Sequence, residues 1–329
     1  MPELNNFEYM IEDYSLYCTS KNLSQKTIIS YDKTLQLFAM YLENELNVVS
    51  FEQVEPKHIR HYIKYLQERG KYTVATANAD INSPENRDDF GKELSPNTIN
   101  NYIRNIKVFF NFMVEERYIR ESPAERIKYL KKREKIKEAI TREELKKILD
   151  QFDVLTLHGH RDYIITKLLV STGARIGETL SLTDDDIDFK NGVIIFKDTK
   201  NKKEKVGYLT NRMSFELKRW INFREKYSQH TNEWLFPTNR GTKLQVTSYG
   251  KSLRSAGKKA GIEDVHPHRL RATFAIEFLR NGGSIHVLSR LLDHSSVQVT
   301  EIYLNMNNDD IRREYMKHNP IDLMWGGGR

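Results

Sequence analysis

Histidine, arginine and tyrosine side chains cluster near the C-terminal end of this 329-residue sequence. Between Val265 and Tyr303 lie His268, Arg271 and His294, interleaved with apolar residues at helical spacing. Histidines can move protons, an arginine keeps its positive charge, and a tyrosine hydroxyl can act as a nucleophile. These residue types suit an anionic substrate.

A second candidate group follows an apolar segment. Residues 163–170 are apolar nearly all round, as expected of a helix buried in a domain centre, and Gly173 can end that helix in the left-handed conformation. Arg175 comes two residues later, and an arginine beside a buried helix is costly unless an anion meets it. Glu178 is the local partner, although a purely structural ion pair would use these two residues equally well.

The elements between these groups are predicted to be β-strands. The pattern indicates three short antiparallel strands, with Asn191-Gly192 as a hairpin turn, at residues 187–189, 193–196 and 206–209. The second turn is rich in lysine: Lys197, Lys200, Lys202, Lys203 and Lys205. A charged turn is often simply solvated, but a lysine on a hairpin can also reach into a site from one side.

The first 122 residues are predicted to be all-helical. Helices are expected to start at Ser24, Pro56 and Ser95, because each position offers a capping residue or a proline at the first turn. Gly70 is expected to close the second helix. Residues 71–93 then form a long polar loop, which is either functional or disordered. The aromatic residues on these helices are interpreted as core.

Charge divides the chain into three parts. Residues 1–122 carry a net charge of −4, residues 123–138 carry +4, and residues 139–329 carry +7. The central part is either a solvated linker or a basic strap across a phosphate backbone. Thr141 and Glu144 have the spacing of a capping box, which indicates that the second domain begins there.

Composition excludes several protein classes. The net charge of +7 and the pI near 9.1 favour a polyanionic partner. The single cysteine, Cys18, excludes an internal disulfide framework and a cysteine-rich zinc site. No apolar run approaches the roughly 20 residues that span a bilayer, and the N-terminus lacks a signal-peptide pattern. We therefore expect a cytoplasmic protein with no membrane partner.

Four motifs together resemble those of the tyrosine recombinase family of phage and transposon integrases and Xer-type recombinases. Ser171–Glu178 (STGARIGE) resembles the first-arginine motif, and Thr199–Lys205 (TKNKKEK) resembles the β-hairpin lysine motif. His266–Arg271 (HPHRLR) matches the His-x-x-Arg box. Leu291–Ser296 (LLDHSS) resembles the Leu-Gly-His motif, with Tyr303 nine residues after its histidine. Each motif alone is weak, but all occur in the family's order.

The resemblance implies a mostly α-helical fold with a small antiparallel sheet. Residues 1–122 would form a helical, SAM-like core-binding domain, residues 123–138 a basic linker, and residues 139–329 the catalytic domain with a C-terminal tail. The two domains would clamp duplex DNA. The implied catalytic residues are Arg175, Lys200, His268, Arg271, His294 and Tyr303, supported by Glu178. The expected DNA-binding residues are Lys131, Lys132, Arg133, Lys202, Lys203 and Arg254.

The implied reaction is site-specific DNA cleavage and rejoining through a covalent 3′-phosphotyrosyl bond and a Holliday junction. It would serve integration, excision or resolution of a mobile element or chromosome. The family works as a homotetramer on two DNA sites, in some cases with an accessory DNA-bending or directionality protein, and needs no metal or other cofactor. This sequence departs from the family at Asp293, where the motif has glycine.

Two other functions fit parts of the sequence. A catalytically silent DNA-binding regulator would keep the fold, although every catalytic position is filled. A metallohydrolase could use His266, His268 and His294, although convergent acids beyond Asp293 are missing. A covalent DNA adduct would exclude the regulator, and cleavage that survives a chelator would exclude the metallohydrolase.

Overall fold

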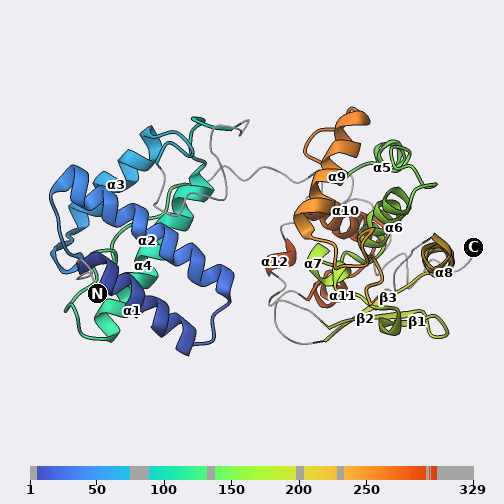
Figure 1. Cartoon of the computed structure of the whole chain (residues 1–329), viewed down its shortest axis with the longest axis horizontal. Coiled ribbons are helices and arrows are strands. Elements are labelled where there is room, and N and C mark those ends of the chain that lie inside the picture. The colour runs from blue at the N-terminus through green and yellow to red at the C-terminus, as the bar shows by residue number, and fades with distance from the viewer. Residues whose placement is uncertain are drawn as a thin grey trace, which may run out of the picture. The chain divides into compact units, whose positions relative to one another are not determined.

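The chain divides into two compact units, Met1–Glu134 and Lys135–Arg329. The structure is a computed structural model, and it describes residues 6–74, 89–131, 138–197, 204–227, 233–293, 296 and 298–301. Figure 1 shows the elements of both units. Each unit has its own hydrophobic core. Their boundary falls within the predicted linker, residues 123–138, while the exact domain limits remain a prediction. None of the helices in the described segments is long and apolar enough to cross a membrane.

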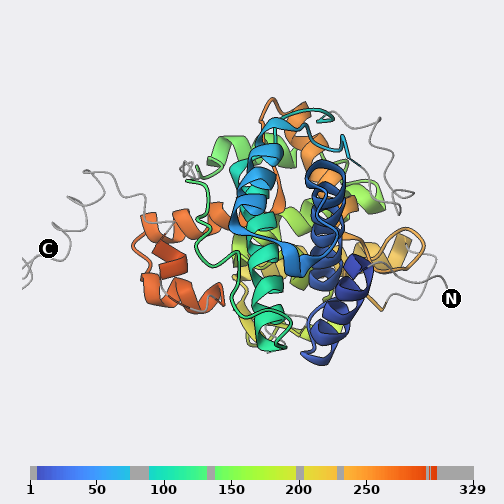
Figure 2. The same ribbon diagram turned by 90° about the vertical axis from the view of Figure 1, so that its left-hand side faces the viewer.

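The secondary structure in the described part of the N-terminal unit is mainly helical, and its helices are coloured from blue to green in Figure 2. Helix α2 packs against α1, α3 and α4. The helices are α1 (Asn6–Ser20), α2 (Gln25–Leu46), α3 (Pro56–Glu68) and α4 (Pro96–Glu115), with a short 3-10 turn η1 (Phe51–Gln53). Their shared core is aromatic, as predicted, and includes Tyr14, Phe38, Phe51, Tyr62 and Phe109.

The three predicted helix starts in this unit are confirmed. The hydroxyl oxygen of Ser24 accepts a hydrogen bond from the backbone N–H of Thr27, and Ser95 caps α4 in the same way through Thr98. Pro56 is the first residue of α3. These caps depend on residues three positions apart, so the local sequence specifies them.

Helix α3 ends next to Gly70, as predicted: its last residue is Glu68 and its cap is Arg69. Gly70 then forms an isolated antiparallel bridge with Glu93. A Cβ atom at position 70 would lie 2.6 Å from the carbonyl oxygen of Gly91. Glycine is therefore required here by the close approach of two backbones. Most of the predicted 71–93 loop, residues 75–88, lies outside the described residues.

The described part of the C-terminal unit combines helices with one small sheet, so the predicted fold class is confirmed. Its first half contains α5 (Arg142–Leu149), α6 (Leu157–Thr172), α7 (Ile176–Leu180), η4 (Asp184–Asp186), β1 (Ile187–Asp188), β2 (Val193–Phe196) and β3 (Lys205–Tyr208). Its second half contains α8 (Asn211–Tyr227), α9 (Val246–Lys259), α10 (Pro267–Arg280), α11 (Ile285–Leu291) and α12 (Gln298–Glu301). The last three elements lie together in orange and red in Figure 2.

Helix α6 is the centre of this unit, as its apolar sequence predicts. It packs against α7, α8, α9 and α10. It begins earlier than the apolar run suggests, because Thr156 caps it by accepting a hydrogen bond from the N–H of Gly159. It ends, as expected, at Gly173 with a φ of 63°. The helix thereby fixes the position of the residues that follow it, including Arg175.

The sheet has the order β1-β2-β3 with antiparallel pairing. The Asn191-Gly192 turn is confirmed, and Gly192 has a φ of 66°. The third strand was predicted one residue too late: it starts at Lys205, which pairs with Phe196. Lys205 is therefore a strand residue and not part of the lysine-rich turn, whose residues 198–203 lie outside the described part of the chain.

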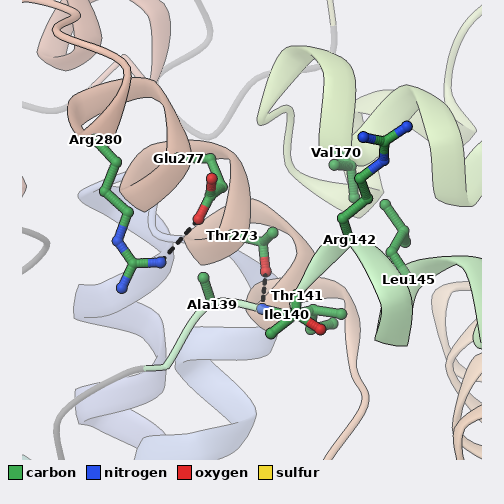
Figure 3. Close-up of a pocket in the computed structure, with 9 residues that line it drawn as sticks. All are labelled: Ala139, Ile140, Thr141, Arg142, Leu145, Val170, Thr273, Glu277 and Arg280. Carbon is green, nitrogen blue, oxygen red and sulfur yellow. Dashed lines mark hydrogen bonds and ion pairs between the residues drawn. The ribbon is translucent and has the colours of Figure 1, made fainter.

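The chain enters the C-terminal unit beside α10. The backbone N–H of Ile140 donates to the hydroxyl of Thr273 at 2.9 Å, and the predicted capping box of Thr141 and Glu144 then starts α5. A cavity of about 370 Å³ lies at this point (Figure 3). Glu277 and Arg280 of α10 line this cavity and form an ion pair, with 2.9 Å between Nη1 of Arg280 and Oε1 of Glu277. These contacts join the start of the unit to the helix that carries Arg271.

Candidate active site

Arg175 is placed by a sharp turn between two helices. Gly173 ends α6, and a Cβ atom there would lie 2.3 Å from the ring of Phe274 and 2.9 Å from Leu292. The positive φ and the lack of space both favour glycine. Arg175 then serves as the N-cap residue of α7 with an extended backbone, and its side chain is 25% exposed. The guanidinium therefore remains accessible at the end of a buried helix.

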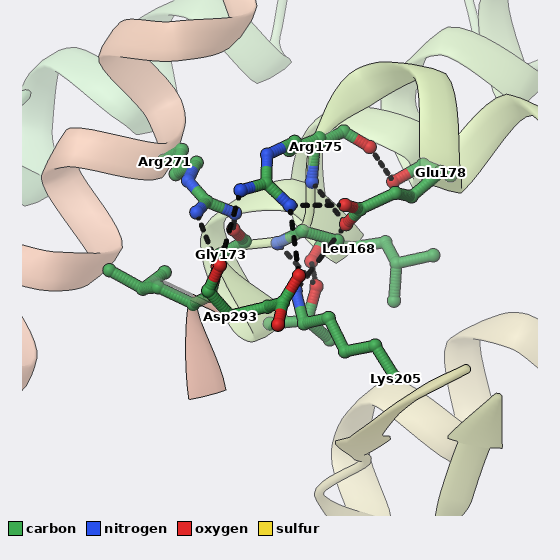
Figure 4. Close-up of polar contacts among 11 residues, drawn as sticks. Leu168, Gly173, Arg175, Glu178, Lys205, Arg271 and Asp293 are labelled. Carbon is green, nitrogen blue, oxygen red and sulfur yellow. Dashed lines mark hydrogen bonds and ion pairs between the residues drawn. The ribbon is translucent and has the colours of Figure 1, made fainter. Parts of the chain in front are cut away.

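Glu178 holds Arg175 through both of its carboxylate oxygens (Figure 4). Oε1 accepts from the guanidinium Nη1 of Arg175 at 2.7 Å, and Oε2 accepts from its backbone N–H at 3.0 Å. Burial favours the neutral acid, but the positive charges of Lys205 and Arg175 outweigh it and lower the pKa of Glu178. The carboxylate therefore stays ionised and fixes the arginine.

Arg271 lies in α10, which brings it beside the end of α6. Its side chain is buried, and two backbone carbonyls orient it: Nη1 donates to Gly173 and Nη2 to Leu292, each at 2.7 Å. Carbonyl groups fix a guanidinium without neutralising its charge. A guanidinium held in this way suits the binding of an anion.

The turn at Leu292 and Asp293 contacts both arginines. Figure 4 shows Asp293 beside them. Leu292 accepts from Arg271, while the backbone oxygen of Asp293 accepts from Nη2 of Arg175 at 3.4 Å. A carboxylate oxygen of Asp293 also lies 3.7 Å from Nη1 of Arg175. Asp293 has a φ of 51°, a conformation that glycine adopts readily and aspartate tolerates. The backbone therefore tolerates aspartate at the position where the family motif has glycine. The Asp293 carboxylate places a negative charge next to Arg175.

Lys205 also belongs to this cluster, although the sequence motifs did not predict a role for it in the site. Its side chain is 5% exposed, and Nζ lies 3.4 Å from Oε2 of Glu178. The signal that could have identified it is the alternation of burial along β3, in which Gly207 also faces inward while Val206 and Tyr208 face outward. Val206 and Tyr208 are apolar although they face outward, so the sequence does not show which residues of β3 are buried.

The other predicted site residues are only partly described. His268 is exposed near the start of α10, one turn before Arg271. Lys131 and Arg254 are also exposed. Seven predicted residues lie outside the described part of the chain: Lys132, Arg133, Lys200, Lys202, Lys203, His294 and Tyr303. The structure thus brings Arg175, Glu178 and Arg271 together, and the roles of all the predicted residues remain predictions.

His266 is the N-cap residue of α10. Its Nδ1 accepts a hydrogen bond from the N–H of Arg269 at 3.1 Å and thereby caps α10. Within the described ranges there is no group of three or more histidine, cysteine or acidic residues arranged to hold a metal ion. The described charges that converge on this site are instead those of arginine, lysine and two carboxylates.

Comparison with known families identifies the chain. Residues 138–309 match the phage integrase family, and residues 7–133 match the phage integrase SAM-like domain. The chain belongs to the phage integrase family. It is a tyrosine-type site-specific DNA recombinase, and the family predicted from the four motifs is confirmed.

Individual relatives agree with this assignment over nearly the whole chain. The tyrosine recombinase XerC of Bacillus pumilus (strain SAFR-032) is 27% identical over 91% of this chain and 92% of the relative. The Tn1549 transposon integrase in complex with a circular intermediate DNA has a TM-score of 0.71 at 20% identity, covering 94% and 99% of the two chains. The XerH recombinase bound to its difH substrate after cleavage has a TM-score of 0.67 at 22% identity, covering 90% and 80%. These likenesses to solved structures concern the fold.

We expect replacement of Asp293 in this recombinase to strengthen its interaction with DNA phosphate. Asp293→Asn removes the negative charge beside Arg175, and asparagine tolerates a positive φ. A unit charge about 6 Å from a phosphate in a partly solvated site is worth roughly 1 to 3 kcal/mol. The cleavage rate at limiting protein concentration should therefore rise about tenfold. Single-turnover cleavage of a labelled duplex measures it.

Asp293→Gly serves as the matched variant for the backbone. Glycine also removes the charge and additionally relieves the left-handed conformation. Similar gains in the two variants would assign the effect to charge, whereas a gain in Asp293→Gly alone would assign it to the backbone. A slower Asp293→Asn protein would contradict the expectation and show that the carboxylate assists the site.

Proposed function

We propose that Arg175 and Arg271 bind the scissile phosphate of duplex DNA and that Tyr303 attacks it. One observation carries the proposal: the two arginines come from distant motifs, yet the Leu292–Asp293 turn directly before His294 contacts both. A phosphodiester resists attack because its oxygens are anionic, so the site must neutralise the charge that grows on them. Two guanidinium groups supply that charge and can bind phosphate oxygens in a bidentate manner.

The proposed reaction conserves the energy of the broken bond. The Tyr303 oxygen forms a bond to phosphorus while the bond from phosphorus to the 5′ oxygen breaks, which gives a 3′-phosphotyrosyl ester and a free 5′ hydroxyl. A 5′ hydroxyl from a second strand reverses these steps and releases the tyrosine. Rejoining therefore requires no ATP, and the arginines and a lysine provide the charge stabilisation.

Three further residues complete the proposed active site. His268 accepts the proton of the Tyr303 hydroxyl, and His294 donates a hydrogen bond to a phosphate oxygen. Lys200 protonates the departing 5′ oxygen from the β2–β3 hairpin. His268 lies one helical turn before Arg271 on the exposed start of α10, which suits a group that meets the substrate. The other two assignments rest on the motifs.

The wild-type protein provides a direct test of this function. A duplex with a nick close to the cleavage site loses a short fragment after cleavage, so the covalent intermediate accumulates. We expect an adduct that survives denaturation and forms equally well in a chelator. Cleavage without an adduct, or an adduct abolished by the chelator, would contradict the proposed chemistry.

We infer that the assembly follows the family pattern. Four protomers would act on two DNA sites and exchange strands in pairs through a Holliday junction, in the cytoplasm. Relatives named as transposon integrase and as Xer recombinases support either a mobile element or a chromosomal site as the target. An accessory DNA-bending or directionality protein would then set the direction of recombination. Recombination between two plasmid-borne candidate sites tests this assembly.

The proposed DNA-binding residues lie in the part of the chain with excess positive charge. They are Lys131, Lys132, Arg133, Lys202, Lys203 and Arg254, of which Lys131 and Arg254 are described and exposed. Residues 139–329 carry +7, whereas residues 1–122 carry −4. The C-terminal unit should therefore supply most of the phosphate attraction, and the N-terminal helices should add sequence recognition.

We expect residues 139–329 alone to retain weak DNA binding that falls steeply with salt. Each phosphate contact contributes about 0.9 to the slope of log affinity against log salt. The separate hydrophobic cores of the two units favour folding of each piece, which circular dichroism would verify. Titration of a labelled duplex at several salt concentrations measures the slopes. Tighter binding by the folded N-terminal piece would contradict this division.

A further inference from the structure

Lys205 is buried at the base of the β2–β3 hairpin. It is the first residue of β3, and its cross-strand partner is Phe196 of β2. The ammonium lies 5.2 Å from the centre of the Phe196 ring, and the side chain is 5% exposed. A lysine is almost never buried to this degree unless it is paired. Its environment therefore requires an explanation beyond solvation of a charged turn.

The ammonium of Lys205 faces charged groups from two other elements. Nζ lies 3.4 Å from Oε2 of Glu178 on α7, the same oxygen that accepts the backbone N–H of Arg175. Burial lowers the pKa of Lys205 to about 8; Glu178 opposes this shift, whereas the positive charges of Arg271 on α10 and of Arg175 add to it. Lys205 is thus electrostatically coupled to both arginines.

We propose that Lys205 is a positioning residue that holds Glu178, and through Glu178 the guanidinium of Arg175, in the geometry that binds the scissile phosphate. The proposal rests on the proposed function, because it concerns the same site. Lys205 itself is too buried to be assigned a contact with DNA. It acts through the carboxylate, and it also fixes the base of the hairpin against α7.

The charge balance of the cluster explains why a third cation is useful. The described groups are three cations, Arg175, Lys205 and Arg271, and two carboxylates, Glu178 and Asp293. With all of them ionised, the charges of these five groups sum to one positive charge, which favours binding of a phosphodiester. Loss of the Lys205 charge removes that excess from the five groups and leaves Arg175 as the main partner of Glu178. The arginine would then satisfy the buried carboxylate at the expense of the phosphate.

The sign of the pH effect follows from this arrangement. Lys205 is positively charged below its pKa of about 8 and becomes neutral as the pH rises through that value. Cleavage at limiting protein concentration reports the protonation of the free protein. The contribution of Lys205 to the rate should therefore be fully present well below pH 8 and should be lost as the pH rises through that value. Arginine stays charged in this range, so Lys205→Arg should move the fall to higher pH.

Lys205→Met and Lys205→Arg provide the test on the full-length protein with the nicked duplex. Methionine has a similar length and suits the contact with Phe196. At pH 7 we expect Lys205→Met to cleave about 10- to 100-fold more slowly, less than the effect typical of a group that itself contacts the developing charge. Lys205→Arg should recover most of the rate. Thermal unfolding verifies that each variant is folded. A folded Lys205→Met protein with the wild-type rate and pH profile would overturn the proposal.

Glu178→Gln shows whether Lys205 acts through the carboxylate. If it does, Lys205→Met should slow the Glu178→Gln protein much less than it slows the wild type, because the shared interaction is already lost. Independent, multiplicative losses would overturn the proposal. So would recovery of Lys205→Met on a substrate with sulfur as the bridging 5′ atom, since that result would make Lys205 the proton donor. The wild-type adduct tests the proposed function separately: its absence refutes that function, whereas its presence with unchanged Lys205 variants refutes only this inference.

Discussion

Tyr303→Phe should abolish the covalent DNA adduct while leaving folding and DNA binding intact. The substitution removes one oxygen and keeps the aromatic ring, so little packing is lost. Without the hydroxyl no bond to phosphorus can form, and the adduct on the nicked duplex should fall below detection. Denaturing electrophoresis of labelled DNA measures the adduct, and mobility shift of an intact duplex measures binding.

Tyr315→Phe is the matched control for this variant. It lies in the same C-terminal tail, and the proposed mechanism assigns it no role. We expect it to form the adduct at close to the wild-type level. An adduct that persists in Tyr303→Phe and maps to Tyr315 would move the nucleophile to that residue and overturn the assignment.

Lys200→Ala should slow cleavage of ordinary DNA severely with almost no effect on binding. The departing 5′ alkoxide is a poor leaving group, and a positioned acid that protonates it is typically worth roughly 10² to 10⁴ in rate. Sulfur at the bridging 5′ position leaves as a thiolate, whose acid has a pKa of about 8.5 and hardly needs protonation. The variant should therefore recover on the sulfur substrate. Single-turnover rates on the two substrates measure the recovery.

Arg175→Ala separates proton donation from charge stabilisation. It removes a positive charge from the phosphate site, so sulfur in the leaving group should not rescue it. An equal loss for Lys200→Ala on both substrates would mean that Lys200 acts through its charge alone. If the sulfur substrate instead rescued Lys202→Ala or Lys203→Ala, the rescued lysine would be the proton donor.

Local sequence was sufficient where a few neighbouring residues decide the structure. The caps at Ser24, Ser95 and Thr141 satisfy backbone groups three residues away, so their positions follow from residue type. The Asn191-Gly192 turn follows from the positive φ that glycine allows. Helix α6 was predicted to be central because it is apolar on every side.

The sequence was less informative where distant backbones meet. Gly70 follows the end of α3, as predicted, but the sequence did not indicate that the backbone of Gly91 lies too close for a side chain at position 70. The start of β3 was misplaced because Val206 and Tyr208 are apolar and yet face outward, at 48% and 63% exposure. Burial of a strand residue depends on which face meets the core, and a sheet of three short strands gives little pattern from which to infer it.

The sequence by itself determined the family, the fold class and the order of the motifs that contain Arg175, Glu178 and Arg271. Tertiary structure decided how these residues meet. Carbonyls of Gly173 and Leu292 orient Arg271, which no residue spacing could indicate. Lys205 joins the site because β3 is held in register with β2, which turns this side chain toward α7. Motifs specify residue types, whereas the partners of a buried charge depend on contacts between segments far apart in the chain.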